Sequence, residues 1–191
     1  MKAFLPLLGL LFLAVSMSDD KEQRRETAKK PKRGNVADEK IRAIIRDAAR
    51  RNGVPEPVAL ATAWIESGFN PYEEGDLGWH QNAERFESVV PQGHPHRWDR
   101  KAWHSYGLFQ LLAPYFVRMQ EHPADLLSPE LNADRGTKYL ARLMKRHSGD
   151  LDEVRLAYVG LPVDRRDALA ERVLTKWHKV LRKFGYDDPR L

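Results

Sequence analysis

Hydrophobic residues recur at helical spacing through most of the chain after residue 36. In residues 37–53 one stripe holds Ile41, Ile44, Ile45 and Ala48, and Gly53 follows it as a stop signal. Spacings of three and four residues are typical of an amphipathic helix that packs on a core. This segment is therefore predicted to form the first helix of a domain.

Residues 55–69 predict a second helix, with Pro57 suited to its first turn. One face of it carries four apolar residues, Val58, Ala61, Ile65 and Phe69. The next stretch, residues 71–104, is rich in Gly, Pro, His and Trp and has little periodicity, so it predicts a long loop.

The second half of the chain predicts further helices. Residues 106–120 indicate a turn and a short helix, and a longer helix is expected from a capping Asn132 to Gly149. A short helix follows at 150–160, and an amphipathic one at 164–185 buries Leu169, Val173, Trp177 and Leu181. No strand or repeat stands out, so the expected fold is mostly α, a bundle of five to seven helices.

The N-terminus has the pattern of an export signal. Residues 1–18 combine Lys2, a short apolar run and small residues, which predicts a signal peptide, with an uncleaved anchor as the alternative. Residues 19–36 are charged and predict a disordered linker ahead of a domain at 37–187. The basic run "KKPKR" within this linker is either a solvated tail or a patch that binds nucleic acid or cell wall.

The net charge and the cysteine content bear on the partner and on the cellular location of the protein. The formal net charge of +5 suits an acidic partner without choosing among nucleic acid, an anionic membrane and a wall polymer. The chain has no cysteine, which excludes a disulfide framework and a lipid-modified cysteine. An exported protein without disulfides fits a bacterial envelope, and we expect a periplasmic or envelope-associated location.

Glu66 stands where the backbone disfavours it, near the negative end of the second helix. On a helical wheel it lies beside Ala59, Thr62 and Ala63, whose small side chains would leave room at the carboxyl. An acid held partly out of water at this end is expected to keep its proton near neutral pH and to act as a general acid. The Thr62 hydroxyl could reach the carboxyl and temper this effect. The alternative is a surface glutamate tolerated at a helix end.

Two more short motifs complete a pattern. Glu66-Ser67 is followed by Gly107-Leu108-Phe109-Gln110 and then by Ala157-Tyr158-Val159. In this order the sequence resembles the lytic transglycosylases that cut bacterial peptidoglycan, and their relatives the goose-type lysozymes. The signature of that family is an acid and Ser near a helix end, then Gly-Leu-Met-Gln, then Ala-Tyr-Asn. The resemblance covers about residues 37–162 and implies a lysozyme-like helical fold.

The resemblance also implies a mechanism and a site. Glu66 would protonate the glycosidic oxygen and then accept a proton from the muramyl C6 hydroxyl, giving a 1,6-anhydro sugar. Tyr158 would orient the acid, Ser67 and Gln110 would contact sugar groups, and Gly107 would let the backbone approach the glycan. Without the resemblance, Tyr158 would be interpreted as a core aromatic and Gln110 as a polar residue at a helix start.

The sequence departs from the family pattern at three points. Phe109 replaces Met, which changes a packing residue, and Val159 replaces Asn, which removes a polar group near Tyr158. The third departure is the long connection between the first two motifs. Its tryptophans, Trp79, Trp98 and Trp103, could stack on sugar rings.

The same connection leaves two questions open. One of its carboxylates, with Glu73 and Asp76 nearest to the catalytic helix, could position a water and make the enzyme an inverting hydrolase; the alternative is a lid with solvated acids. Its four histidines, at positions 80, 94, 96 and 104, could suggest a metal, but they lack a recognisable ligand motif, so we expect no metal and no cofactor.

The function favoured by the sequence is cleavage of the β-1,4 bond between N-acetylmuramic acid and N-acetylglucosamine by an exported enzyme. The expected partner is the peptidoglycan glycan strand. We expect no nucleic acid partner, no stable membrane insertion after signal cleavage, and a monomer. The alternatives are a non-catalytic peptidoglycan-binding protein, a basic nucleic-acid-binding protein that uses residues 21–33, and a membrane-active protein built on residues 164–185.

Overall fold

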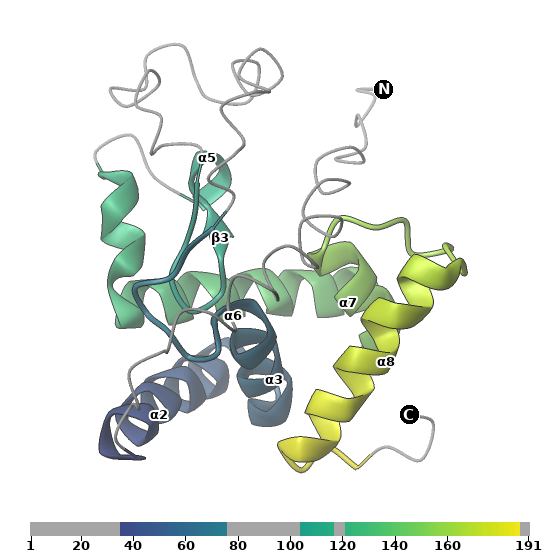
Figure 1. The fold of residues 1–191 in the computed structure, drawn as a ribbon, viewed down its shortest axis with the longest axis horizontal. Helices are drawn as coiled ribbons and strands as arrows, with labels where there is room; N and C mark the ends of the chain where they lie inside the picture. The colour runs from purple at the N-terminus through teal and green to yellow at the C-terminus, as the bar shows by residue number, and fades with distance from the viewer. Residues whose placement is uncertain (1–34, 76–103, 117–120, 188–191) are drawn as a thin grey trace, which may run out of the picture.

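The computed structural model describes residues 35–75, 104–116 and 121–187 (Figure 1). The expected signal peptide, the expected linker up to residue 34, and residues 76–103 of the long connection lie outside the described residues.

Helices dominate the described part of the chain, which confirms the mostly α prediction. The longer helices are α2 (Asn35–Asn52), α3 (Glu56–Ser67), α6 (Pro129–Arg146), α7 (Leu151–Tyr158) and α8 (Ala168–Lys183). Two short elements precede α6, namely α5 (Ala113–Phe116) and the 3-10 helix η3 (Pro123–Leu127). None of these described helices is both long enough and apolar enough to cross a bilayer.

Helix boundaries follow local capping chemistry. The Asp150 carboxylate caps α7 by accepting the N–H groups of Asp152 and Glu153, each at 3.0 Å. The predicted start of α6 at Asn132 is wrong. The helix begins at Pro129, because Ser128 caps it by accepting the N–H of Leu131 at 3.4 Å and proline suits the first turn.

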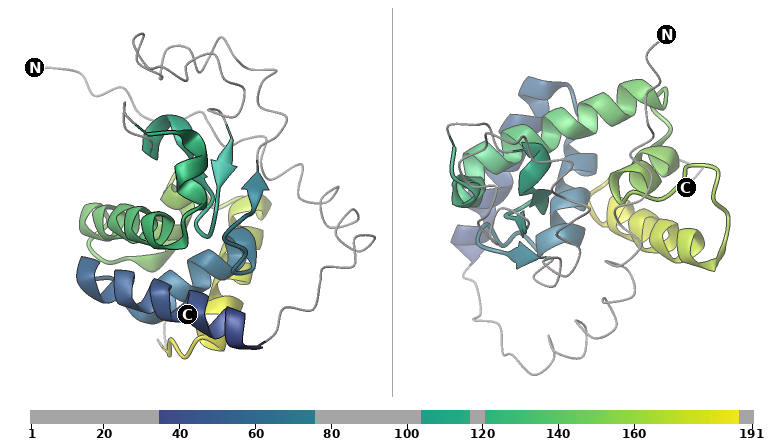
Figure 2. Two further views of the ribbon diagram at one scale, coloured as in Figure 1. Left: turned by 90° about the vertical axis from the view of Figure 1, so that its left-hand side faces the viewer. Right: turned by 90° about the horizontal axis from the view of Figure 1, so that it is seen from above.

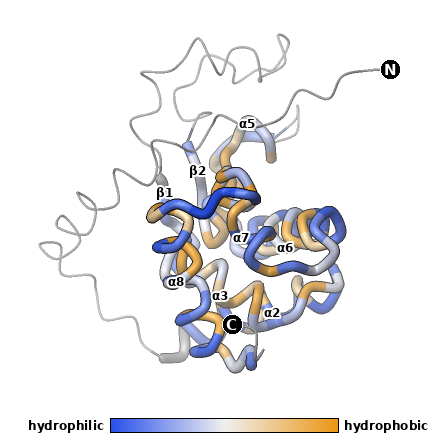
Figure 3. Tube along the Cα trace, turned by 90° about the vertical axis from the view of Figure 1, so that its right-hand side faces the viewer, coloured by the Kyte–Doolittle hydropathy of each residue, from blue (hydrophilic) through white to orange (hydrophobic). Residues whose placement is uncertain are grey.

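Helix α3 packs against α2 on one side and α8 on the other (Figure 1). Helix α6 packs across α2 and also contacts α7, which in turn packs on α8 (Figure 2). Hydrophobic positions recur along these helices between hydrophilic ones (Figure 3), as amphipathic packing requires.

Helix α3 is buried on nearly all sides. Ala59, Thr62 and Ala63 have exposed fractions of 0%, 1% and 0%. Their small size suits close packing in the core. That they leave room beside the Glu66 carboxyl stays a prediction. The predicted apolar stripes of α2 and α8 point to the core as expected, with Ile45, Ala48, Trp177 and Leu181 fully or almost fully buried.

A small antiparallel sheet was not visible in the sequence. It orders β1 (Glu74–Gly75), β2 (Ser105–Tyr106) and β3 (Leu111–Leu112), with Glu74 opposite Tyr106 and Tyr106 opposite Leu111. Strands of two residues are too short to produce a readable alternation. The β2–β3 hairpin carries the turn at residues 107–110, which includes the second sequence motif.

Candidate active site

Glu66 lies in the last turn of α3. The helix ends because Gly68 adopts a left-handed conformation with φ 60°, and its N–H donates to the Trp64 carbonyl at 2.9 Å. Phe69, also left-handed at φ 65°, is fully buried, with its ring centroid 5.3 Å from that of Trp64. The end of α3 that carries Glu66 is therefore anchored in the core.

The Glu66 carboxylate is paired with an arginine that the sequence interpretation did not single out. Arg155 Nη1, from α7, donates to Glu66 Oε1 at 2.7 Å. The side chains are 7% exposed for Arg155 and 19% for Glu66, so the pair is largely buried but the acid still reaches the surface. The guanidinium carbon of Arg155 lies 5.7 Å from the ring centroids of both Tyr158 and Trp177.

This arrangement changes the expected surroundings of the acid. The Thr62 hydroxyl does not reach the carboxyl, because it donates to the Val58 carbonyl at 2.9 Å. The hydrogen bond to the carboxyl comes instead from Arg155 of α7. That Glu66 works as a general acid stays a prediction.

Residues from three helices bind the backbone of the 107–110 turn. From α3, Ser67 Oγ donates to the Leu108 carbonyl at 2.9 Å. From α7, Tyr158 Oη donates to the Phe109 carbonyl at 2.7 Å. The turn is thereby fixed against the helix end that carries Glu66.

Asn132 of α6 supplies the third attachment. It is fully buried; its Oδ1 accepts the Phe109 N–H at 2.9 Å, and its Nδ2 donates to the carbonyls of Tyr106 and Leu126, each at 2.8 Å. Asn132 therefore satisfies three buried backbone groups at once.

Tyr158 is a neutral hydrogen-bond donor at this site. Burial raises the pKa of Tyr158 well above its ordinary value, and the negative charge of Glu66 raises it further. Its hydroxyl bonds to the turn, and its ring lies beside the Arg155 guanidinium. That Tyr158 orients the acid stays a prediction.

The side chain of Gln110 and the position of Gly107 are also engaged with protein. Gln110 Oε1 accepts from Ser105 Oγ at 3.0 Å, and Gln110 Nε2 donates to the Glu73 carbonyl at 3.0 Å. Gly107 has φ 72°, and a Cβ there would lie 2.5 Å from Asn132 Nδ2. The sugar contacts expected of Ser67, Gly107 and Gln110 stay predictions.

Both substituted motif residues are packing residues. Phe109 is fully buried against Gly136, where an added Cβ would lie 2.3 Å from Phe109 Cγ. Val159 ends α7 and is 8% exposed within a small apolar cluster that also contains Leu161 and Ala170.

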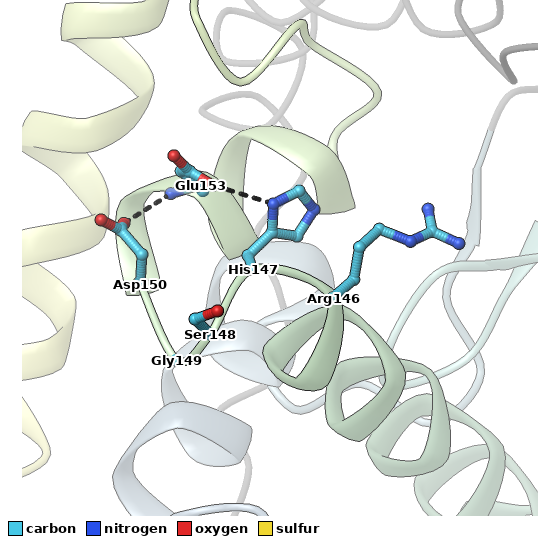
Figure 4. Close-up of a pocket in the computed structure, with 6 residues that line it drawn as sticks. All are labelled: Arg146, His147, Ser148, Gly149, Asp150 and Glu153. Atoms are coloured by element: carbon cyan, nitrogen blue, oxygen red, sulfur yellow. Dashed lines mark hydrogen bonds and ion pairs between the residues drawn. The ribbon is translucent and has the colours of Figure 1, made fainter.

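A separate hollow of about 520 Å³ lies at the turn between α6 and α7 (Figure 4). It is lined by Arg146, His147, Ser148, Gly149, Asp150 and Glu153. His147 Nδ1 lies 2.9 Å from Glu153 Oε2 there. None of the motif residues lines it, so we do not assign the chemistry of Glu66 to this hollow.

Within the described ranges, no group of three or more His, Asp or Glu side chains is placed to hold a metal ion. Three of the four histidines considered from the sequence, His80, His94 and His96, lie outside those ranges, as do the three tryptophans of the long connection.

The sequence interpretation missed Arg155 and the role of Asn132. Arg155 stands between the buried Val154 and Leu156 in a helical segment. A charged residue flanked by core residues is a signal for a buried partner. Asn132 gave a weaker signal, because asparagine is equally common as a helix cap.

Comparison with known proteins identifies the family of the chain. Residues 43–174 match the Transglycosylase SLT domain. The chain is 31% identical over 148 residues to the membrane-bound lytic murein transglycosylase C of Klebsiella pneumoniae subsp. pneumoniae, and 30% identical over 148 residues to that of Klebsiella pneumoniae strain 342. Each match covers 78% of this chain but 34% of the relative, so the chain spans about a third of the length of these relatives. No solved structure matches significantly. The chain belongs to the transglycosylase SLT domain family.

Proposed function

We propose that the chain is a peptidoglycan lytic transglycosylase in which Glu66 is the sole acid and base. Family membership and the names of the two relatives support the reaction class. The observation that carries the assignment to Glu66 is its position. It is a partly exposed carboxylate at the point where motif residues from α3 and α7 bind the 107–110 turn.

The proposed reaction needs one carboxyl group. Protonated Glu66 donates its proton to the oxygen that links N-acetylmuramic acid to N-acetylglucosamine, and the bond from that oxygen to the muramyl anomeric carbon breaks. The Glu66 carboxylate then accepts the proton of the muramyl C6 hydroxyl while the C6 oxygen forms a bond to the anomeric carbon. The product is a 1,6-anhydromuramyl end, no water is consumed, and Glu66 regains its proton.

The proposal extends to location. Residues 1–18 would direct export, and the chain would act on glycan strands in the periplasm or envelope as a monomer. The relatives' printed description as membrane-bound supports an envelope location. The reaction requires no metal or cofactor, because proton transfer and an internal nucleophile suffice.

The experiment must distinguish the proposed lytic transglycosylase from an inverting muramidase. It would need a second carboxylate opposite Glu66 to activate water. Of the candidates, Glu73 is described, and its Oε2 accepts from Asn70 Nδ2 at 2.8 Å. Asp76 and the later acids of the connection lie outside the described residues.

The test is mass spectrometry of muropeptides released from purified peptidoglycan by residues 19–191. We expect products one water lighter than those of a hydrolytic muramidase, and no release by Glu66→Gln. The matched control is Glu73→Gln, which removes a nearby carboxylate and should leave the anhydro products unchanged.

The other outcomes are equally distinct. Ordinary reducing-end products that depend on Glu66 would indicate a hydrolase, and loss of release in Glu73→Gln would identify its second acid. If folded wild-type protein binds peptidoglycan but releases nothing, the proposal fails and a binding protein becomes the better interpretation.

A further inference from the structure

Arg155 is an unusual neighbour for a catalytic acid. Its side chain is 7% exposed, its Nη1 binds Glu66 Oε1, and its Nε is buried without a hydrogen-bond partner among the described residues. Its guanidinium carbon also lies 5.7 Å from the ring centroids of both Tyr158 and Trp177. Contacts from α3, α7 and α8 thus fix one cation beside one carboxylate.

Burying an arginine is unfavourable unless its charge is compensated. In the described part of the chain, Glu66 is the acid that Arg155 contacts. The two aromatic rings add favourable cation–π contacts but carry no charge. The pair therefore depends on the ionised form of Glu66, and a proton on that carboxyl competes directly with Arg155.

This competition bears on the proposed reaction, in which Glu66 must hold a proton before it can act. Other charged or titratable groups around this end of α3 and its partner Tyr158 lie on four neighbouring helices. They are Arg42 on α2 beside Phe69, Lys183 on α8 beside Trp64, Tyr158 on α7, and Tyr139 on α6, which lies beside Arg142. Among these groups and Arg155, the hydrogen bond to the carboxylate comes from Arg155.

We propose that Arg155 is a positioning residue that holds Glu66 as a carboxylate in the free enzyme and sets the pH above which the acid step fails. The proposal rests on the proposed function. Release of Glu66 from Arg155, by protonation or by bound glycan, is then a required step. The same guanidinium favours the carboxylate that forms when the proton moves to the leaving oxygen.

The first test is the pH profile of muropeptide release. In Arg155→Gln, we expect the alkaline half-point of activity to move upward by about one pH unit, the effect typical of removing a neighbouring opposite charge. Arg155→Lys keeps the charge and should stay near the wild-type profile. Arg135→Gln is the matched control, because Arg135 is an 11% exposed arginine paired with Glu121 instead. It should leave the half-point unchanged.

A purely structural role would lower activity at every pH without moving the half-point. A folded Arg155→Gln protein with an unmoved alkaline limb, or an equal shift in Arg135→Gln, would overturn the proposal. Circular dichroism and thermal melts establish which variants are folded.

A second measurement needs neither substrate nor a stable Arg155 variant. In wild-type protein carrying ¹³C-glutamate and ¹⁵N-arginine, the Glu66 Cδ signal, assigned by its loss in Glu66→Gln, is followed by NMR as pH changes. We expect the Arg155 guanidinium signals to change with the same midpoint, because protonation breaks the pair. Arg155 signals that ignore the titration of Glu66 would contradict the proposal. If the protein releases no muropeptides at any pH, the proposed function fails, while this measurement still decides whether Arg155 holds Glu66.

Discussion

At the residue scale, Gly107 shows how the second motif is specified by packing. Its φ of 72° is left-handed, and a Cβ would lie 2.5 Å from Asn132 Nδ2 and 2.7 Å from the Leu126 carbonyl oxygen. We expect Gly107→Ala to lower the free energy of unfolding by roughly 2–4 kcal/mol, the sum of left-handed strain and overpacking. Urea unfolding followed by circular dichroism measures this loss.

Gly53→Ala is the control for the strain alone. Gly53 has φ 67°, but nothing lies within 4 Å of an added Cβ. Its loss should be about 1–2 kcal/mol. Equal losses in the two variants would mean that the turn relaxes around the methyl group and that Gly107 is not required by Asn132.

Single residues also show where sequence reasoning stops. Glu66 could be singled out because a carboxylate at a helix C-terminus breaks a local rule. Arg155 lies 89 positions away from Glu66, and their contact depends on how α3 and α7 pack, which no local pattern encodes. Asn132 was interpreted as a helix cap, but it is buried in the core. A buried asparagine and a capping asparagine cannot be distinguished from sequence alone.

At the scale of elements, α2, α3 and α8 were predictable because each carries an apolar stripe at helical spacing. Gly53 and Gly68 end α2 and α3 in left-handed conformations, as glycine at such positions predicts. The sheet was not predictable. Its two-residue strands depend on pairing between residues 74–75 and 105–106, which are separated by the long connection.

The end of α7 gives a prediction about the third motif. Val159 packs with Leu161 and Ala170, so Val159→Asn, which restores the family residue, would bury an amide in an apolar cluster. We expect it to be less stable than Val159→Ala by about 1–3 kcal/mol, measured by urea unfolding. We expect no gain in muropeptide release. Higher activity with unchanged stability would show instead that residue 159 can reach the site.

The start of α8 gives a pH prediction. Hydrogen bonds from the Ala170 N–H, with help from the nearby Arg165 guanidinium, hold the pKa of Asp167 below its usual range. A folded-state pKa below the unfolded value means that the stabilisation is present above about pH 4 and is lost as pH falls through the folded-state pKa.

Asp167→Asn keeps a capping oxygen but removes the charge. Wild-type protein should therefore melt at a higher temperature than this variant at pH 7, and the two melting temperatures should converge as the solution is acidified below pH 4. Asp164→Asn, at an exposed position in the same loop, controls for net charge. A difference in melting temperature between wild type and Asp167→Asn that stays constant from pH 7 to pH 3 would contradict the lowered pKa of Asp167.

At the scale of the whole molecule, one core cluster joins all five longer helices. It contains Ile45 of α2, Val58 of α3, Leu140 of α6, Val154 of α7 and Trp177 of α8. The Glu66–Arg155 pair adds a polar link between α3 and α7 inside the same body. Because each helix buries its apolar face against the others, loss of one exposes the rest, and the domain should unfold as a single unit.

Scanning calorimetry of the protein should therefore give one endotherm, with a calorimetric enthalpy close to the van't Hoff enthalpy. Unfolding in two transitions is the alternative. It has a structural basis, because a second apolar cluster joins α7 to α8; it contains Leu156, Val159, Leu161 and Ala170. If that pair formed an independent unit, two transitions would be resolved, and Arg155→Gln would separate them further by removing its link to α3. One transition in both proteins would mean that the apolar core alone couples α3 to α7. Arg155 would then act on the charge of Glu66 rather than on the coupling of the two helices.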